Sequence, residues 1–329
     1  ESISILTAVK MVFMSVAMYA LINHKFPKLL YPVKTAFAVM YSLCGYVILY
    51  GSCFTPWMDI VALFPLLMLA LDRLLTTGKK LFYIFMVALS FIINYYLSAM
   101  ALIYVFLVSG VYILLLCERK EWKKHAWNLG IGTAAGMGLS CFVLIPVFMQ
   151  LSGSQRGNAG GSIVSQYLGW IKGAIVTDGS MAAFQRYMML YGLSFVLAVI
   201  LIGLKKYKED KKMCRVMACL LGIALLPMFV EGINLMWHFG SYNGYTLRNG
   251  FLIAFTLLCM GAYYAQKMFA DMPLEKKYIK RQIVIAAVMC LVYAAGYLLI
   301  PQNNEILATI FFVAVFITMF IVYLRKIKE

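Results

Sequence analysis

The sequence is short of acidic residues and has no polar stretch long enough to form a water-exposed domain. Asp and Glu number 13 against 29 Lys and Arg, which gives a formal net charge of +16 at pH 7. A positive balance of this size is typical of nucleic-acid-binding proteins. Here, however, the basic residues stand in short clusters between long apolar runs, as in the cytoplasmic loops of membrane proteins. We therefore expect no nucleic-acid partner.

Several motifs of soluble enzymes are also missing. There is no GxGxxG after a strand, no GxxxxGK[ST] phosphate loop and no GxSxG nucleophile elbow. The eight cysteines form no CxxC pair and fall mostly in apolar runs, where Cys acts as a small hydrophobe. We identify no cofactor, and the sequence leaves open whether a divalent metal assists. An enzyme with this sequence would need a donor that arrives already activated, as a lipid within the bilayer.

Apolar residues are what the chain has in abundance. They make up 64% of the sequence, whereas a soluble domain is about half apolar. Uncharged runs of about twenty residues match the length that crosses ~30 Å of hydrocarbon. We predict an all-α polytopic membrane bundle, one transmembrane domain over 1–329. The eleven predicted spans are 3–22, 35–50, 58–73, 81–94, 97–117, 126–149, 188–204, 213–230, 249–267, 282–300 and 306–324.

The distribution of Lys and Arg predicts the orientation of these spans. Alternate loops hold 24 of the 29 basic residues, and such loops face the cytoplasm. The pattern predicts a multi-pass protein of the bacterial plasma membrane with a cytoplasmic C-terminus and with residue 1 outside. The apolar run 81–117 has basic residues at both ends, so it must turn back at Asn94, Tyr95 and Tyr96.

Two loops are expected on the outer side. Loop 150–187 has apolar residues at helical spacing, which predicts either an interfacial helix on the membrane surface or an ordinary packed loop helix. Loop 231–248 ends at Arg248 and contains a polar and aromatic group: Trp237, His238, Tyr242 and Asn243. Aromatic residues at an interface usually form a belt. With polar partners they also bind sugars, by stacking and hydrogen bonds.

Two charges stand out at the predicted outer boundary. Asp59 precedes an apolar run, where it would either cap the helix N-terminus or face a cavity as a functional carboxylate. Lys10 lies inside span 3–22, about 10 Å below the boundary at 1.5 Å per residue. Its ammonium would either snorkel to the interface or bind a lipid phosphate in a cavity.

The order of several short motifs resembles the YfhO family of bacterial multi-spanning membrane proteins. The motifs are LTAVK at 6–10, YSLCGY at 41–46, WMD at 57–59, FPL at 64–66, NYY at 94–96, IP at 145–146, SQR at 154–156, WH at 237–238, NGY at 243–245 and RNGF at 248–251. They extend over nearly the whole chain. Their shared order and spacing, rather than any single motif, carry the resemblance.

The resemblance implies a GT-C type glycosyltransferase that moves a sugar from a polyprenyl-phosphate donor to an envelope polymer, such as lipoteichoic acid, at the outer membrane face. It implies that Asp59 is catalytic and that Lys10 and Arg248 bind the donor phosphate. The residues implied in sugar or acceptor binding are Trp57, Trp237, His238, Tyr242 and Asn243. GT-C enzymes usually place an essential Asp in the first outer loop, which here would precede Glu1. Asp59 would then be a second acid.

Two other functions fit the same sequence. A transporter or flippase would move a lipid-linked or envelope substrate without covalent chemistry, although such carriers often show inverted repeats and none is visible here. A membrane scaffold would tolerate replacement of every outer polar residue.

Overall fold

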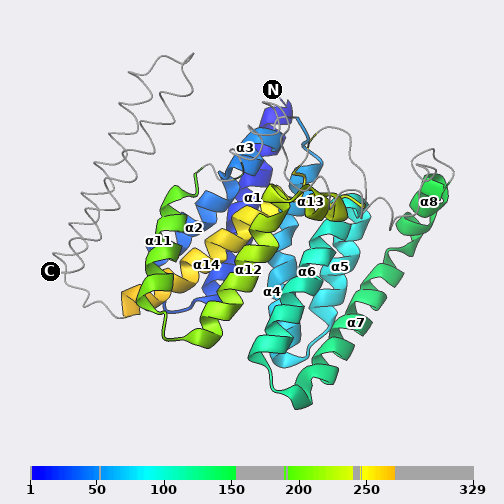
Figure 1. The fold of residues 1–329 in the computed structure, drawn as a ribbon. Coiled ribbons are helices and arrows are strands. Elements are labelled where there is room, and N and C mark those ends of the chain that lie inside the picture. Colours follow the sequence, from blue (N-terminus) through cyan, green and yellow to red (C-terminus); the bar gives the residue numbers. More distant parts are fainter. Residues whose placement is uncertain are drawn as a thin grey trace. The chain divides into compact units, whose positions relative to one another are not determined.

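The computed structural model describes residues 2–51, 53–152, 189, 192–239, 245 and 247–270, and the elements in this part of the chain are helices (Figure 1). They are α1 (Ser2–Lys25), α2 (Tyr31–Ser42), α3 (Gly45–Gly51), α4 (Trp57–Thr77), α5 (Leu81–Ile93), α6 (Tyr95–Leu116), the 3-10 helix Arg119–Glu121, α7 (Trp122–Leu139), α8 (Cys141–Ser152), α11 (Ser194–Lys206), α12 (Lys211–Phe229), α13 (Glu231–Trp237) and α14 (Gly250–Ala270). The all-α prediction is confirmed.

Six of the described segments are long and apolar enough to cross a membrane, or seven if the bent pair formed by α7 and α8 counts as one. They include α1, α4, α6, α12 and α14, and the segment Tyr31–Gly51 formed by α2 and α3. The protein is therefore a multi-pass membrane protein. The predicted spans 282–300 and 306–324 and most of loop 150–187 lie outside the described residues, so eleven spans remain a prediction.

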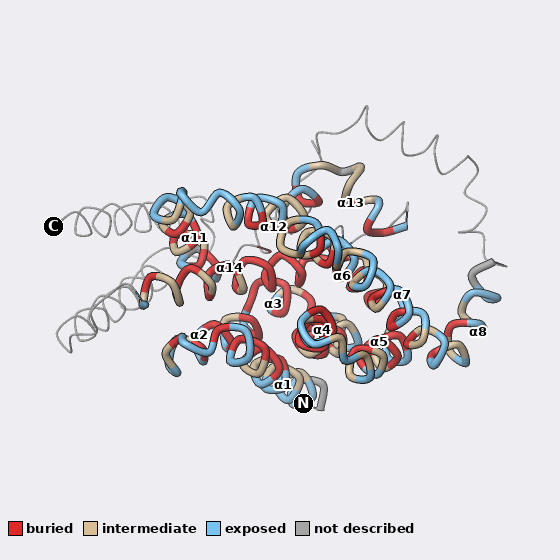
Figure 2. Tube along the Cα trace, turned by 90° about the horizontal axis from the view of Figure 1, so that it is seen from below, coloured by how far each residue is buried: buried red, intermediate tan, exposed pale blue. Residues whose placement is uncertain are grey.

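Helices α4 and α14 form the buried centre of the described bundle (Figure 2). Phe64 of α4 packs against Phe255 of α14, with ring centroids 4.7 Å apart. By contrast, α1 exposes apolar side chains such as Val9, Val12 and Val16. In a bilayer such faces contact lipid, so their exposure follows from the membrane setting rather than from poor packing.

Two helix boundaries bear on the predicted spans. Asn94 ends α5 and begins α6, and its side-chain oxygen accepts a hydrogen bond from the Leu97 amide at 3.1 Å. The predicted break at Asn94 is thus confirmed, and Asn94 stabilises the start of α6 as its N-cap. The segment predicted as one span at 126–149 is not one straight helix, because the chain bends by 76° between α7 and α8, as in a broken span or a re-entrant loop. The bend follows Gly136 and Gly138 and precedes Pro146, which are residue types that weaken a helix.

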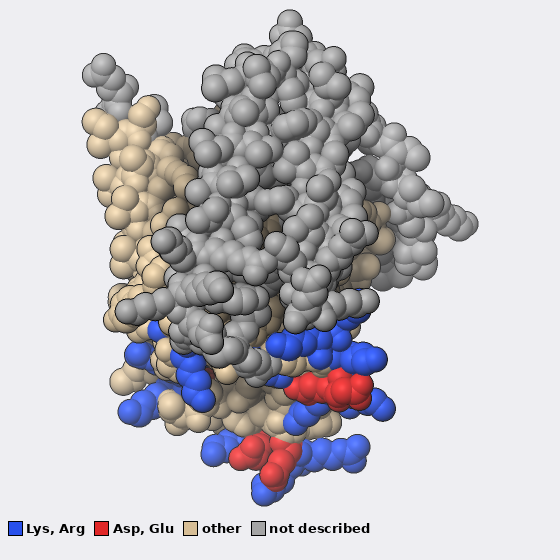
Figure 3. Space-filling model, turned by 90° about the vertical axis from the view of Figure 1, so that its left-hand side faces the viewer, with Lys and Arg blue, Asp and Glu red and all other residues tan. Residues whose placement is uncertain are grey.

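Helices α1 and α4 run side by side in the same direction and are joined by ion pairs at both ends. At the end where α4 begins, Lys10 pairs with Asp59. At the other end, Asp72 pairs with His24 and Lys25. We call these the Asp59 end and the Asp72 end. Charged side chains gather at the lower, Asp72 end in Figure 3. Among the described basic residues, Lys10 and Arg248 are the two that lie at the Asp59 end.

Candidate functional site

An aromatic cluster lies at the Asp59 end of the bundle. Trp57, the first residue of α4, stacks on Phe54 of the preceding loop with ring centroids 4.3 Å apart. Tyr245, which precedes α14, meets Phe54 edge-on at 4.6 Å. Tyr50 of α3 contacts Trp57 at 5.4 Å. We call these four residues the aromatic cluster. Two parts of the sequence, residues 50–57 and Tyr245, therefore build one partly exposed aromatic surface.

Arg248 lies against this cluster and is held by several elements. Its guanidinium carbon is 5.7 Å from the ring centroid of Trp57 and 5.3 Å from that of Tyr96. Its Nη1 donates a hydrogen bond to Tyr96 Oη at 3.1 Å, and its backbone carbonyl accepts one from Tyr46 Oη at 3.0 Å. A stacked guanidinium presents a planar set of donors suited to phosphate or carboxylate oxygens. These contacts therefore fix an anion-binding group over Trp57.

The second cation of this end forms an ion pair. Lys10 Nζ lies 2.7 Å from Asp59 Oδ1 and donates to the Thr55 carbonyl at 3.0 Å. An ammonium has three donors, so these contacts use two of them. The pair brings together two of the sequence-predicted site residues, 49 positions apart along the chain. Asp59 lies two residues after Trp57 in the first turn of α4, so the pair and the aromatic cluster share this end of the helix, although side chains two positions apart do not face each other.

The capping interpretation of Asp59 is wrong. The N-cap position of α4 is occupied by Pro56, no side chain caps the helix, and Asp59 is the third helical residue. A carboxylate in the first turn still interacts favourably with the helix dipole, at about 0.3–1 kcal/mol. Lys10 pairs with the carboxylate, which remains partly exposed.

Trp237 and His238 are buried at the end of α13. The Nδ1 atom of His238 lies 2.8 Å from the Asn234 carbonyl, an arrangement in which Nδ1–H donates. Burial, reinforced by the positive charge of Arg248, lowers the pKa of His238 to about 4 despite that hydrogen bond. His238 is therefore neutral near pH 7 and lies within electrostatic range of Arg248. Tyr242 and Asn243 lie outside the described residues.

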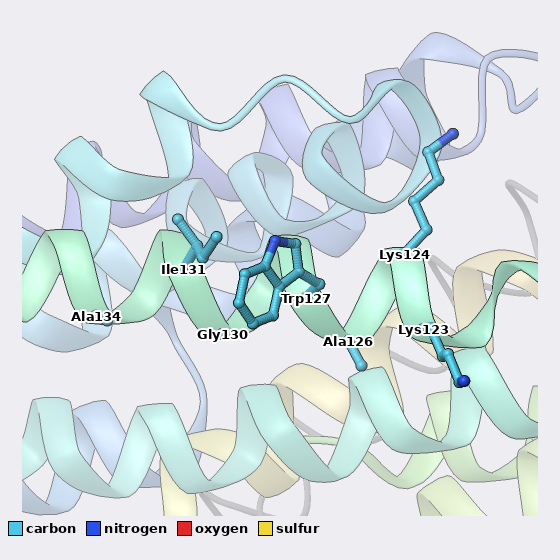
Figure 4. Close-up of a pocket in the computed structure, with 7 residues that line it drawn as sticks. All are labelled: Lys123, Lys124, Ala126, Trp127, Gly130, Ile131 and Ala134. Carbon is cyan, nitrogen blue, oxygen red and sulfur yellow. The ribbon is translucent and has the colours of Figure 1, made fainter.

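Other features of the described chain are less suited to chemistry. Within it, no group of three or more His, Cys, Asp and Glu could hold a metal ion. A shallow depression on α7 is lined by Lys123, Lys124, Ala126, Trp127, Gly130, Ile131 and Ala134 (Figure 4). Its exposed tryptophan beside two lysines is typical of an anchor at the membrane interface. It has no acid among its lining residues and does not resemble the Asp59 end.

Sequence reasoning missed four residues of the site. Two of them, Tyr46 and Tyr96, form hydrogen bonds with Arg248. The other two, Tyr50 and Phe54, pack against the ring of Trp57. The sequence offered a partial signal, since Tyr46 and Tyr96 belong to the YSLCGY and NYY motifs. Their hydrogen bonds to Arg248 span 202 and 152 positions, a separation that no local pattern encodes.

Comparisons with known proteins give one match. Neither the curated proteins nor the solved structures contain one that matches this chain. The family model described as "Bacterial membrane protein YfhO" matches residues 1–329. With its apolar helices and this match over the whole chain, the protein belongs to the YfhO family of bacterial membrane proteins.

Proposed function

We propose that this protein is a membrane glycosyltransferase that moves a sugar from a polyprenyl-phosphate donor to an envelope polymer, such as lipoteichoic acid, at the outer face of the plasma membrane. One observation carries the proposal. An accessible carboxylate, two held cations and an aromatic surface lie together at the end of the described bundle that is otherwise poor in charge. This is the set of groups that transfer from a lipid phosphate needs.

Each group has a role in the proposed reaction. The acceptor hydroxyl attacks the anomeric carbon, its new C–O bond forms, and the bond from that carbon to the donor phosphate breaks. Asp59 takes the proton of the hydroxyl. Lys10 and Arg248 bind the phosphate, whose charge grows as it leaves.

The aromatic cluster supplies the surface on which a sugar ring can stack. Trp57 carries Arg248 on its ring and so joins the sugar-binding and phosphate-binding parts of the site. Trp237 and His238 are buried, so their part is to support the loop that precedes Arg248. Tyr242 and Asn243 remain predicted contacts of the sugar or the acceptor.

The charge distribution supports an outward-facing site. The lower end in Figure 3 gathers Lys and Arg, and such clusters face the cytoplasm in most membrane proteins. We therefore propose that the Asp59 end faces outward, and the cytoplasmic C-terminus remains a prediction from the sequence. A donor carried by a bilayer lipid can then reach the site from the outer leaflet, without a soluble cofactor.

The test is the sugar content of the envelope polymers, measured by mass spectrometry in cells that lack the full-length gene. We expect one sugar substituent to disappear, and wild type but not Asp59→Asn to restore it at equal membrane levels. Restoration by both variants would remove Asp59 from the mechanism. An unchanged sugar content under conditions where the gene is expressed would contradict the enzyme proposal and favour a transporter.

A further inference from the structure

The hydroxyl of Tyr50 is unusual among the buried tyrosines of the bundle. Tyr50 is 1% exposed, and its Oη has no hydrogen-bond partner in the described part of the chain. Four other buried tyrosines each have a partner for this atom. Their partners are the Val61 carbonyl for Tyr41, the Arg248 carbonyl for Tyr46, Thr133 for Tyr83 and Thr256 for Tyr104, at 2.8, 3.0, 3.0 and 2.7 Å respectively.

Tyr50 cannot satisfy its hydroxyl with a hydrogen bond to the backbone of its own helix. Ser98 and Ser109 also have buried hydroxyls without a partner among the described residues. A helical serine can rotate its hydroxyl onto a carbonyl one turn back. The Tyr50 hydroxyl stands at the far end of a rigid ring, so it needs a partner from elsewhere. Buried polar groups without partners are uncommon and call for an explanation, such as a bound ligand.

The position of Tyr50 indicates what such a ligand would be. Its ring contacts Trp57 at 5.4 Å and Tyr245 at 5.8 Å, so it belongs to the aromatic cluster. Arg248 lies over the same Trp57 ring, with its guanidinium carbon 5.7 Å from the ring centroid, so Tyr50 and Arg248 both border Trp57. A hydroxyl donor and a guanidinium therefore act on one region, which favours an anionic oxygen over a neutral one.

We infer that the Tyr50 hydroxyl donates a hydrogen bond to a phosphate oxygen of the lipid-linked donor, beside Arg248. The inference rests on the proposed function and adds a residue to its phosphate site. It explains why a buried hydroxyl is kept without a protein partner: the ligand supplies the acceptor. Tyr50 adds a donor without adding charge, so the site binds the phosphate without a third cation in the membrane.

The experiment uses the full-length protein in lipid nanodiscs and follows binding by tryptophan fluorescence. The probes are a polyprenyl phosphate, the matching polyprenol and inorganic phosphate. We expect Tyr50→Phe to weaken binding of the polyprenyl phosphate about tenfold or more, as loss of a hydrogen bond to a charged group does. Polyprenol binding should not change. Thermal stability should not fall, since Tyr50→Phe breaks no hydrogen bond within the described chain.

Tyr83→Phe is the matched control. It removes a buried hydroxyl that bonds to Thr133, far from the aromatic cluster, so it should lower stability and leave lipid binding unchanged. Equal polyprenyl-phosphate binding by wild type and Tyr50→Phe would overturn the inference and leave the proposed function standing. Equal weakening of phosphate and polyprenol would overturn it too. A Tyr50-dependent response to inorganic phosphate without lipid binding would assign the site to a free anion and overturn the lipid donor.

If the wild-type protein bound neither lipid and transferred no sugar, the proposed function would fail, and the inference with it. The two failures are distinguishable, because one appears in the wild type and the other appears only in Tyr50→Phe.

Discussion

Helices α1 and α4 are linked by ion pairs at both ends, and the two links differ in which partner meets water. At the Asp72 end the acid is 14% exposed, while His24 and Lys25 are 39% and 46% exposed. At the Asp59 end the order is reversed, with Lys10 at 15% and Asp59 at 34%. The same two helices thus bury the acid at one end and the cation at the other.

We interpret this reversal as a difference in role: the ion pair at the Asp72 end is structural, and the ion pair at the Asp59 end takes part in the reaction. At the Asp72 end, the more buried carboxylate pairs with two exposed side chains, His24 and Lys25, which leaves that carboxylate little access to a ligand. At the Asp59 end, the more buried ammonium holds a carboxylate that a substrate can reach. The aromatic cluster and Arg248 lie at the same end of α4 as the latter pair. The predictions below test this difference, beginning with the largest effect.

Asp59→Asn keeps the size of the side chain and removes its charge and its ability to take a proton. We expect transfer to fall by about 10²-fold or more, the contribution of a general base. The measurement is the rate of sugar transfer by the reconstituted full-length protein. Asp72→Asn is the control and should transfer at nearly the wild-type rate. Equal losses in both variants would mean that the two ends do not differ in function.

His238 should make stability at the Asp59 end sensitive to acid. Its folded pKa of about 4 lies below the ordinary value of 6.5, so between these values the unfolded chain binds more protons. Its contribution is therefore complete above about pH 6.5 and is lost as the pH falls toward 4. At 1.36 kcal/mol per unit, the loss is on the order of 3 kcal/mol. Denaturation of the protein in detergent micelles across this range measures it.

The matched variant is His238→Asn, whose side-chain amide can replace the Nδ1–H donor without titrating. It should show a flatter dependence of stability on pH. A dependence as steep as that of wild type would mean that another group is responsible.

Arg248→Lys keeps the positive charge but loses the planar fork and its stacking on Trp57 and Tyr96. Because Arg and Lys are not equivalent at stacked sites, we expect transfer to fall by roughly tenfold, with most of the effect on donor affinity. The KM for the donor and kcat should be measured separately. An unchanged KM would contradict the assignment of Arg248 to the phosphate.

Asp72→Asn should have its effect on stability rather than on transfer. Because both partners, His24 and Lys25, are well exposed, the loss should be about 1 kcal/mol or less. Chemical denaturation measures it, and Lys25→Gln should give a similar or smaller loss. A loss of transfer without a loss of stability would reverse the roles of the two ends.

The sequence predicted the local features well. Hydropathy located the long described helices, and the turn at Asn94 followed from the basic residues at both ends of one apolar run. It did not predict the short helix α13, which lies in the expected loop 231–248. The bend between α7 and α8 was missed, because hydropathy continues across it. The capping of Asp59 was mistaken because Lys10, its actual partner, lies on another helix. Tyr96 was recognised as part of a turn, and its contact with Arg248 depends on how α6 and the loop before α14 pack, which a single sequence does not encode.

The claim that only the ion pair at the Asp59 end takes part in the reaction is tested most directly by exchanging the two charges within each ion pair. One double variant carries Lys10→Asp and Asp59→Lys, and the other carries Lys25→Asp and Asp72→Lys. Sugar transfer and thermal stability would be measured for both. We predict that the exchange at the Asp72 end keeps transfer near the wild-type level, whereas the exchange at the Asp59 end leaves a folded protein that transfers no sugar. Transfer at the wild-type rate after exchange at the Asp59 end would show that this pair, too, only holds the helices together.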